Sequence, residues 1–158
     1  MVEIHNSVAK VYEENKETLE IFECLDEFSD TQNFCDHYGF DIEDSCNAIL
    51  IKAKKPEEFY AMFCVLGANR LDVNHKAKEA MGAKRVSFAS REEAEAVTGQ
   101  IYGGISPLGL PENIRVYMDK NVTDREKLFI GAGNRVSKFF LSPETLIDLS
   151  SAKVLDLT

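Results

Sequence analysis

The stretch GQIYGGISPLGLP, residues 99–111, holds four glycines and two prolines among thirteen residues. It contains no His, Asp, Glu, Cys or Lys, although 28% of the whole chain is charged. Glycine adopts backbone conformations closed to other residues, and proline fixes φ and donates no hydrogen bond. Such a loop has a defined shape, and its free N–H groups can bind anions or stabilise a developing oxyanion. The alternative is a tight structural crossover between a helix and a strand.

The loop lies within an irregular series of helices and strands. Capping residues and apolar spacing predict helices near residues 8–12, 31–39, 73–81 and 91–97, and a last helix that begins after Ser142. Ser90 and Glu93 form a capping box for the helix at 91–97, and Gly99 ends it. Apolar and alternating runs predict strands near residues 19–24, 47–53, 59–66, 84–89, 114–118, 128–131, 136–141 and 154–157. This interleaving is typical of an α+β domain with a mixed sheet. The length of 158 residues predicts that residues 1–158 form a single domain.

Charge is unevenly distributed along the chain. Residues 1–51 hold two Lys or Arg against thirteen Asp or Glu, residues 52–100 hold nine against seven, and the net charge is −9. Binding along a nucleic-acid duplex requires a basic face. We therefore expect no DNA partner, and the charge leaves room only for contact with the end of a nucleic acid.

Cysteine usage and hydropathy indicate the compartment. The cysteines at positions 24, 35, 46 and 64 form no C-x-x-C pair, so we expect reduced, buried thiols and no metal site. The first residues show no apolar signal segment, and no apolar run is long enough to cross a membrane. These features predict a cytoplasmic protein without membrane contact.

The pattern TGQIYGGISPLG, residues 98–109, resembles the signature loop of the YbaK/prolyl-tRNA synthetase-associated domain family. The runs RLDVNHKAKEAMGAKRVSFAS (70–90) and LFIGAGNR (128–135) resemble two further elements of that family. The segments SPETL and VLDL resemble its C-terminal end, so the resemblance extends over roughly residues 8–157 in one order. It implies a mainly antiparallel mixed sheet with surrounding helices.

The resemblance also implies an activity, the hydrolysis of the ester bond of a mischarged tRNA by a trans-editing enzyme. The implied substrate is the acceptor end of tRNA-Pro carrying Cys, Ala, Ser or Thr, with prolyl-tRNA synthetase as a further partner and no cofactor. The family's G-x-x-x-P element falls on Gly103 and Pro107. It implies that the backbone amides of Gly103 and Gly104 are catalytic, and that Ile105, Ser106 and Pro107 contact the substrate. For Ser106 the alternative is a local turn bond.

Three positions depart from the family pattern. Members usually carry a lysine at the start of the strand in a K-T-L pattern, and here the sequence CNAILI places Asn47 there. Lys138 stands where some members have an aspartate, and Cys24 where some have a tyrosine in the pocket. We expect Lys138 to supply the positive charge that Asn47 lacks; the alternative is an ordinary surface lysine. Other candidates for phosphate contact are the lysines Lys52, Lys54 and Lys55.

The departure at Asn47 also supports a second hypothesis. In it the chain is a catalytically weak or inactive binding module that recognises a tRNA end, a synthetase or a small amino-acid-like ligand. The intact GGISP sequence opposes this hypothesis, because it retains the loop. No heptad pattern demands a partner helix, so we expect a monomer or weak dimer.

Overall fold

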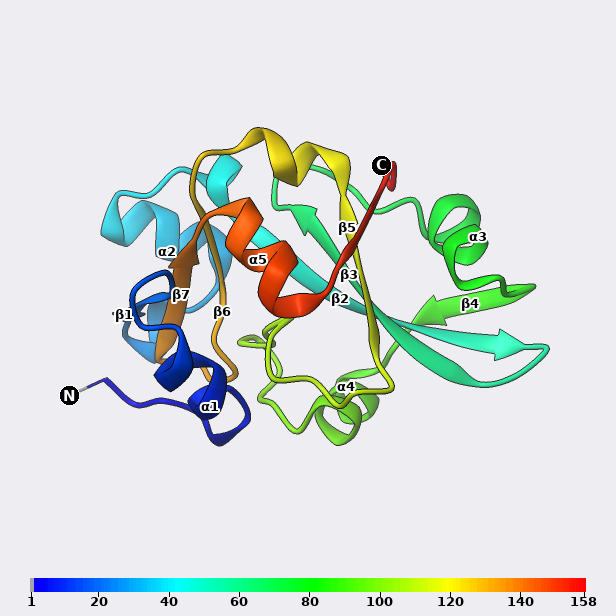
Figure 1. The fold of residues 1–158 in the computed structure, drawn as a ribbon, viewed down its shortest axis with the longest axis horizontal. Coiled ribbons are helices and arrows are strands. Elements are labelled where there is room, and N and C mark those ends of the chain that lie inside the picture. The colour runs from blue at the N-terminus through cyan, green and yellow to red at the C-terminus, as the bar shows by residue number, and fades with distance from the viewer. Residues whose placement is uncertain (1) are drawn as a thin grey trace.

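The computed structural model describes residues 2–158 and shows two sheets flanked by helices (Figure 1). An antiparallel three-stranded sheet has the order β1-β7-β6, and a five-stranded sheet has the order β4-β2-β3-β5-β8. The pairs β3–β5 and β5–β8 are parallel, and the others are antiparallel. The strands are β1 (Glu20–Glu23), β2 (Cys46–Lys55), β3 (Phe59–Leu66), β4 (Arg85–Phe88), β5 (Arg115–Asp119), β6 (Leu128–Gly131), β7 (Ser137–Leu141) and β8 (Lys153–Leu155). The predicted α+β fold with a mixed sheet is confirmed.

The helices are α1 (Asn6–Glu14), α2 (Thr31–Tyr38), α3 (Lys78–Met81), α4 (Arg91–Thr98) and α5 (Pro143–Ser150). Helices α2, α4 and α5 begin at capping residues that the sequence indicated, whereas α1 begins after His5, ahead of the predicted 8–12. Ser90 and Glu93 form the predicted capping box of α4, and Ser142 caps α5. The helix predicted over 73–81 begins with a wider π turn, in which the Ala77 N–H donates to the Asp72 carbonyl. Within residues 2–158 no helix is long and apolar enough to cross a bilayer.

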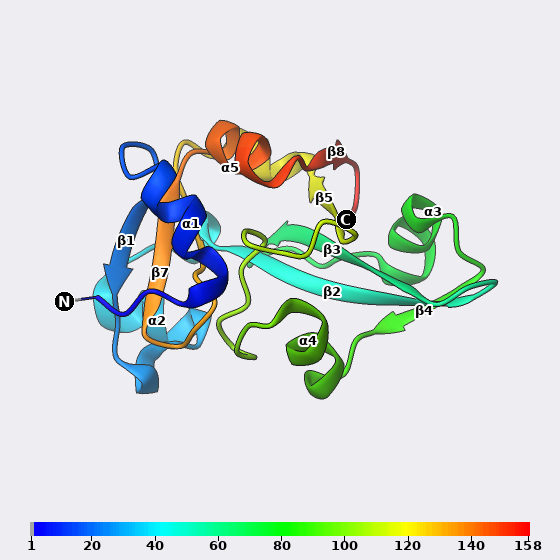
Figure 2. The same cartoon turned by 60° about the horizontal axis from the view of Figure 1, so that its bottom comes forward.

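Among residues 2–158, a single backbone bridge joins the two sheets. Ser45, which precedes β2, forms a parallel bridge with Phe129 of β6. Figure 2 shows the two sheets turned relative to each other, with the chain that follows α4 passing between them. The largest core cluster fills one side of both sheets and includes Leu108 from the loop. On the other side, α2 packs on the three-stranded sheet through Phe34.

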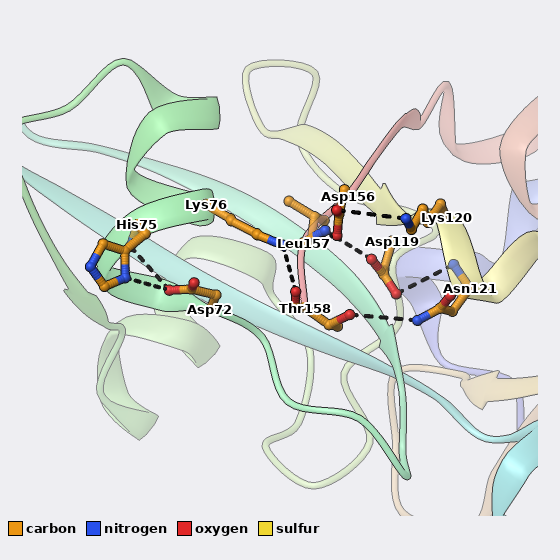
Figure 3. Close-up of polar contacts among 9 residues, drawn as sticks. All are labelled: Asp72, His75, Lys76, Asp119, Lys120, Asn121, Asp156, Leu157 and Thr158. Carbon is orange, nitrogen blue, oxygen red and sulfur yellow. Dashed lines mark hydrogen bonds and ion pairs between the residues drawn. The ribbon is translucent and has the colours of Figure 1, made fainter.

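The C-terminal residues are fastened to the five-stranded sheet by buried polar contacts (Figure 3). The carboxylate of Asp119 is fully buried and accepts from the Leu157 N–H at 2.8 Å. The Nζ of Lys76 donates to the Thr158 carbonyl at 2.6 Å. The last strand therefore ends at Leu155 rather than spanning the predicted 154–157, because the Leu157 N–H is directed to the carboxylate. Asp119 is a buried titratable group with a structural role.

Candidate active site

The loop of residues 99–111 is held closed by one buried amide side chain. Gln100 is 2% exposed; its Nε2 donates to the Leu108 carbonyl at 2.9 Å, and its Oε1 accepts from the Ser106 N–H at 2.6 Å. The hydroxyl of Ser106, itself fully buried, accepts from the Leu108 N–H at 3.1 Å. This is the turn contact given above as the alternative for Ser106. Sequence reasoning missed Gln100, since the only signal was a polar residue inside a loop otherwise built of apolar and backbone-shaping residues.

The centre of the loop packs backbone to backbone against the segment after β6. The Gly104 N–H donates to the Ile101 carbonyl at 2.9 Å, and the Gly104 carbonyl accepts from the Gly133 N–H at 2.7 Å. The Ile101 N–H donates to the Gly133 carbonyl at 2.9 Å. Within residues 2–158, the N–H groups of Gly103 and Ile105 make no hydrogen bond. Of the two predicted catalytic glycines, Gly103 thus offers a free donor, whereas the N–H of Gly104 is used in the turn.

A guanidinium group lies beside this free donor. Gly103 has φ +92°, and a Cβ atom there would collide with Nη1 of Arg135. The Arg135 Nε donates to the Asp26 carboxylate at 3.0 Å, and its side chain is 35% exposed. A partly exposed guanidinium next to a backbone N–H can hold a carboxylate or phosphate oxygen. Sequence reasoning also missed Arg135 as a site residue, because a single arginine after a glycine-rich turn forms no distinctive pattern.

Lys138 of β7 is buried rather than on the surface. It is 6% exposed, its Nζ donates to the Ser29 carbonyl at 3.0 Å, and it lies 5.1 Å from the centroid of the Phe34 ring. Among residues 2–158 it forms no ion pair. Burial lowers the pKa of Lys138, because the charged ammonium loses its hydration. The interpretation as an ordinary surface lysine is therefore wrong.

Cys24 lies directly after β1 and close to Lys138. It is 3% exposed, and its Sγ donates weakly to the Arg135 carbonyl at 3.7 Å. Burial raises the pKa of the Cys24 thiol, and the nearby Lys138 charge partly opposes this rise. The thiol therefore stays protonated near neutral pH. Cys24, Tyr38 and Val136 line a groove of about 380 Å³.

The sheet register relates Asn47 to these groups. Gly131 of β6 is paired with Lys138, and Phe129 is bridged in parallel to Ser45. Two residues beyond this bridge, β2 reaches Asn47 and β6 reaches Gly131. Because alternate residues of a strand share one face, Asn47, Gly131 and Lys138 lie on the same side at the junction of the sheets. A side chain on Gly131 would collide with the carbonyls of Gly104 and Ile105, so the loop covers the same place.

These observations describe a small site built on backbone N–H groups with two cations nearby. The sequence model of the aminoacyl-tRNA editing domain matches residues 26–149, and the chain belongs to this family. The resemblance inferred from the loop is confirmed. Domains of this family act on aminoacyl-tRNA and occur in proline–tRNA ligases.

Individual relatives extend the comparison. EbsC of Enterococcus faecalis, a protein assigned as a Cys-tRNA(Pro)/Cys-tRNA(Cys) deacylase, is 30% identical over 92 residues, which cover 58% of this chain and 56% of EbsC. The proline–tRNA ligase of Nautilia profundicola is 34% identical over 106 residues, 66% of this chain but 18% of the ligase. The chain thus matches about half of one relative and a small part of the other.

A solved structure shows the same fold over its whole length. A protein assigned as a trans-editing enzyme for prolyl-tRNA synthetase superposes with a TM-score of 0.83 at 22% identity, covering 99% of each chain. A second, of a hypothetical protein, gives a TM-score of 0.85 at 22% identity, covering 96% of this chain and 99% of the other.

Proposed function

We propose that this chain hydrolyses the ester bond of mischarged aminoacyl-tRNA, with tRNA-Pro carrying Cys, Ala, Ser or Thr as its substrates. The observation that carries the proposal is the pair of free N–H groups of Gly103 and Ile105 at the centre of the loop. The neighbouring N–H groups of Gly104 and Ser106 are committed to the Ile101 carbonyl and the Gln100 side chain. Donors that are already oriented need no reorganisation when a carbonyl oxygen gains negative charge. Removing one such donor typically lowers kcat by about 10²–10³-fold.

In this reaction the attacking water, assisted by the free hydroxyl of the terminal ribose, adds to the ester carbon. The N–H groups of Gly103 and Ile105 stabilise the oxyanion that forms. The bond between that carbon and the ribose oxygen then breaks, and the ribose oxygen takes up the proton. The products are a free amino acid and a tRNA with its terminal ribose restored.

The charges around the loop support the binding of a tRNA end. Arg135 lies against Gly103, where it can contact the terminal phosphate. Lys138 lies on the same face as Asn47, so it supplies a positive charge close to the position where the family usually has a lysine. Asn47 keeps one donor and one acceptor for the substrate.

The groove beside Cys24 is the candidate place for the side chain of the esterified amino acid. It has a volume of about 380 Å³, and its lining includes the apolar Leu25 and Val136 and the carboxylates of Glu23 and Asp26. A groove of this volume admits side chains of any size, so selection would depend on the groups that line it rather than on volume. The relative EbsC is assigned as a Cys-tRNA(Pro) deacylase, which supports a small side chain as the substrate.

The test is a deacylation screen. The pure protein is incubated with tRNA-Pro carrying Ala, Cys, Ser, Thr or, as control, Pro, and loss of the ester is followed against a blank without enzyme. We expect rapid hydrolysis of at least one mischarged species and none of Pro-tRNA-Pro. Gly103→Ala should lower kcat by about 10²-fold or more through loss of the donor geometry. Its matched control is Gly82→Ala, which also has a positive φ (+62°) but has no atom within 4 Å of the added Cβ.

The specific observation that favours a binding module instead is Asn47. Its Oδ1 accepts from the Ser45 hydroxyl at 3.3 Å, and the nearest lysine on β2 is Lys52, five residues further along the strand. A binding module would retain uncharged tRNA in a filter-binding assay, and no ester would be lost faster than in the blank. That outcome across all aminoacyl groups tested would replace the deacylase proposal by the binding module.

A further inference from the structure

A second groove lies on the same face as Asn47, under the edge strand β4. It has a volume of about 600 Å³ and is lined by Ile49, Phe88 and the segment 69–75, which leads into α3. Phe88 is 62% exposed, more than any other large apolar side chain that the structure leaves exposed among residues 2–158. Much of the Phe88 ring is thus open to solvent beside a groove that also holds the Asp72–His75 pair. Such a ring stacks well on a nucleobase, because every base has a π face.

Cations without partners surround this groove. Arg70 lines it, and Lys54, Lys55, Lys84 and Arg85 gather at the adjoining end of the β2–β3 hairpin and the start of β4. Among residues 2–158 none of these five forms an ion pair. Lys55 and Arg85 are cross-strand partners, and like charges in that position are destabilising. In a chain of net charge −9, this local surplus of positive charge is complementary to a polyanion.

The groove is in line with the candidate active site. Ile49 follows Asn47 by two residues on the same face of β2, and Phe88 is paired with Ile51. Four residues along the strand and one strand across give roughly 14 Å between Asn47 and Phe88. The groove therefore lies too far away for the terminal nucleotide, whose ester would occupy the active site. The groove lies between the candidate active site and the basic end of the β2–β3 hairpin, where the preceding nucleotides of an RNA strand would lie.

We propose that this groove binds an unpaired nucleotide of the tRNA's single-stranded 3′ end, with its base stacked on Phe88 and a phosphate held by Arg70. The cations at the hairpin end contact phosphates further along the same strand. This inference rests on the proposed function and adds the recognition of the RNA that precedes the ester. Stacking tolerates any base, so the groove contributes affinity and positions the RNA strand, and it does not select a base sequence.

The test compares Phe88→Ala with Phe88→Tyr, which keeps the aromatic face, and with Val154→Ala, a partly exposed apolar residue on β8 at the opposite edge of the sheet. We measure KM and kcat on a mischarged tRNA that the screen identifies. We also measure Kd for an uncharged minihelix RNA with and without its single-stranded 3′ tail. Phe88→Ala should raise KM and Kd on the order of tenfold with kcat nearly unchanged. Phe88→Tyr and Val154→Ala should resemble the parent protein, and the minihelix without a tail should not respond to Phe88→Ala.

The cations give an independent readout. Removing two phosphate contacts with the double variant Lys84→Gln and Arg85→Gln should flatten the slope of log K against log salt by about 0.7–0.9 per contact. Lys153→Gln, an exposed lysine on β8 outside any ion pair among residues 2–158, is the matched control and should leave the slope unchanged.

Each outcome separates this inference from the proposed function. If the parent protein deacylates its substrate and Phe88→Ala leaves KM and Kd unchanged, the groove is not an RNA site and the deacylase remains. If the parent shows no deacylation but Phe88→Ala still weakens binding of the tailed minihelix, the groove stands and the deacylase is rejected. A Phe88→Ala defect seen only when prolyl-tRNA synthetase is added would assign the groove to a protein partner and overturn the inference.

Discussion

Replacing Lys138 by Met should make the protein less active and should change how its stability depends on pH. Met keeps an unbranched stem of similar volume and removes the ammonium group. Burying that ion costs several kcal/mol in lost hydration. The hydrogen bond to the Ser29 carbonyl returns about 1.5–3 kcal/mol, and the Phe34 ring about 0.5–2 kcal/mol. Together these contacts return about 2–5 kcal/mol, and Met also leaves the buried Ser29 carbonyl without its donor, which costs about 1–3 kcal/mol. The gains and losses of Lys138→Met therefore largely cancel, and its Tm near pH 7 should stay within about 4 °C of that of the parent.

The pH dependence of protein stability tests the effect of the buried ammonium separately. Burial lowers the pKa of Lys138 in the folded state from 10.5, so between the two values the unfolded chain binds more protons. The stability of the parent therefore rises with pH in that window, and the stability of Lys138→Met relative to the parent falls as the pH approaches 10.5. Thermal unfolding between pH 7 and 10 measures this difference.

The control for Lys138→Met is Lys127→Met. Lys127 also lies over an aromatic ring of the same sheet, 5.6 Å from the Phe140 centroid, but its side chain is 56% exposed and paired with Glu20. It should change neither Tm nor deacylation measurably. A difference in Tm between Lys138→Met and the parent that stays constant from pH 7 to 10 would refute the argument that burial of the ammonium lowers its pKa. Full deacylation activity in that variant would refute the functional role of the charge.

Two further predictions concern the loop and α4. Gln100→Ala leaves the Ser106 N–H and the Leu108 carbonyl without their partner, so it should lower the free energy of unfolding in urea by about 1–3 kcal/mol. It should also lower kcat more than it raises KM. Normal kinetics would show that the shape of the loop does not depend on Gln100. Hydrogen bonds from Lys52, the Ser90 N–H and the Tyr60 hydroxyl lower the pKa of Glu93 from 4.5 to about 2. The stability that Glu93 contributes is therefore present above pH 4.5 and is lost as the pH falls toward 2. The free energy of unfolding of Glu93→Gln should fall less steeply than that of the parent over this pH range. Equal slopes would contradict this prediction.

Local chemistry explains what the sequence could predict. The capping box of Ser90 and Glu93, the cap at Ser142 and the glycine that ends α4 depend only on residues a few positions apart, and all three occur as expected. The loop could be recognised for the same reason, because its glycines and prolines lie in one continuous segment. The exception is the last strand, whose end is set by a carboxylate 38 residues away in sequence.

Long-range packing explains what the sequence could not predict. Lys138 sits in an alternating strand where a charged residue normally faces solvent, and only the placement of α2 over that face buries it. The role of Gln100 depends on the loop folding back so that Ser106 and Leu108 both reach its amide. The position of Asn47 relative to Lys138 depends on a single bridge between two sheets. None of these relations has a spacing that a sequence pattern could reveal.

The loop of residues 99–111 and the segment after β6 pack together as one unit, although 20 or more residues separate them. A side chain on Gly104 would collide with the Asn134 carbonyl, and one on Gly131 would collide with the carbonyls of Gly104 and Ile105. Each glycine is therefore required by the backbone of the other segment rather than by its own turn. The close approach that they permit also sets Arg135 against Gly103, so the same contact that shapes the loop delivers its nearest cation. A site whose donors are backbone N–H groups can be specified only in this way, because its geometry depends on which backbone packs against it.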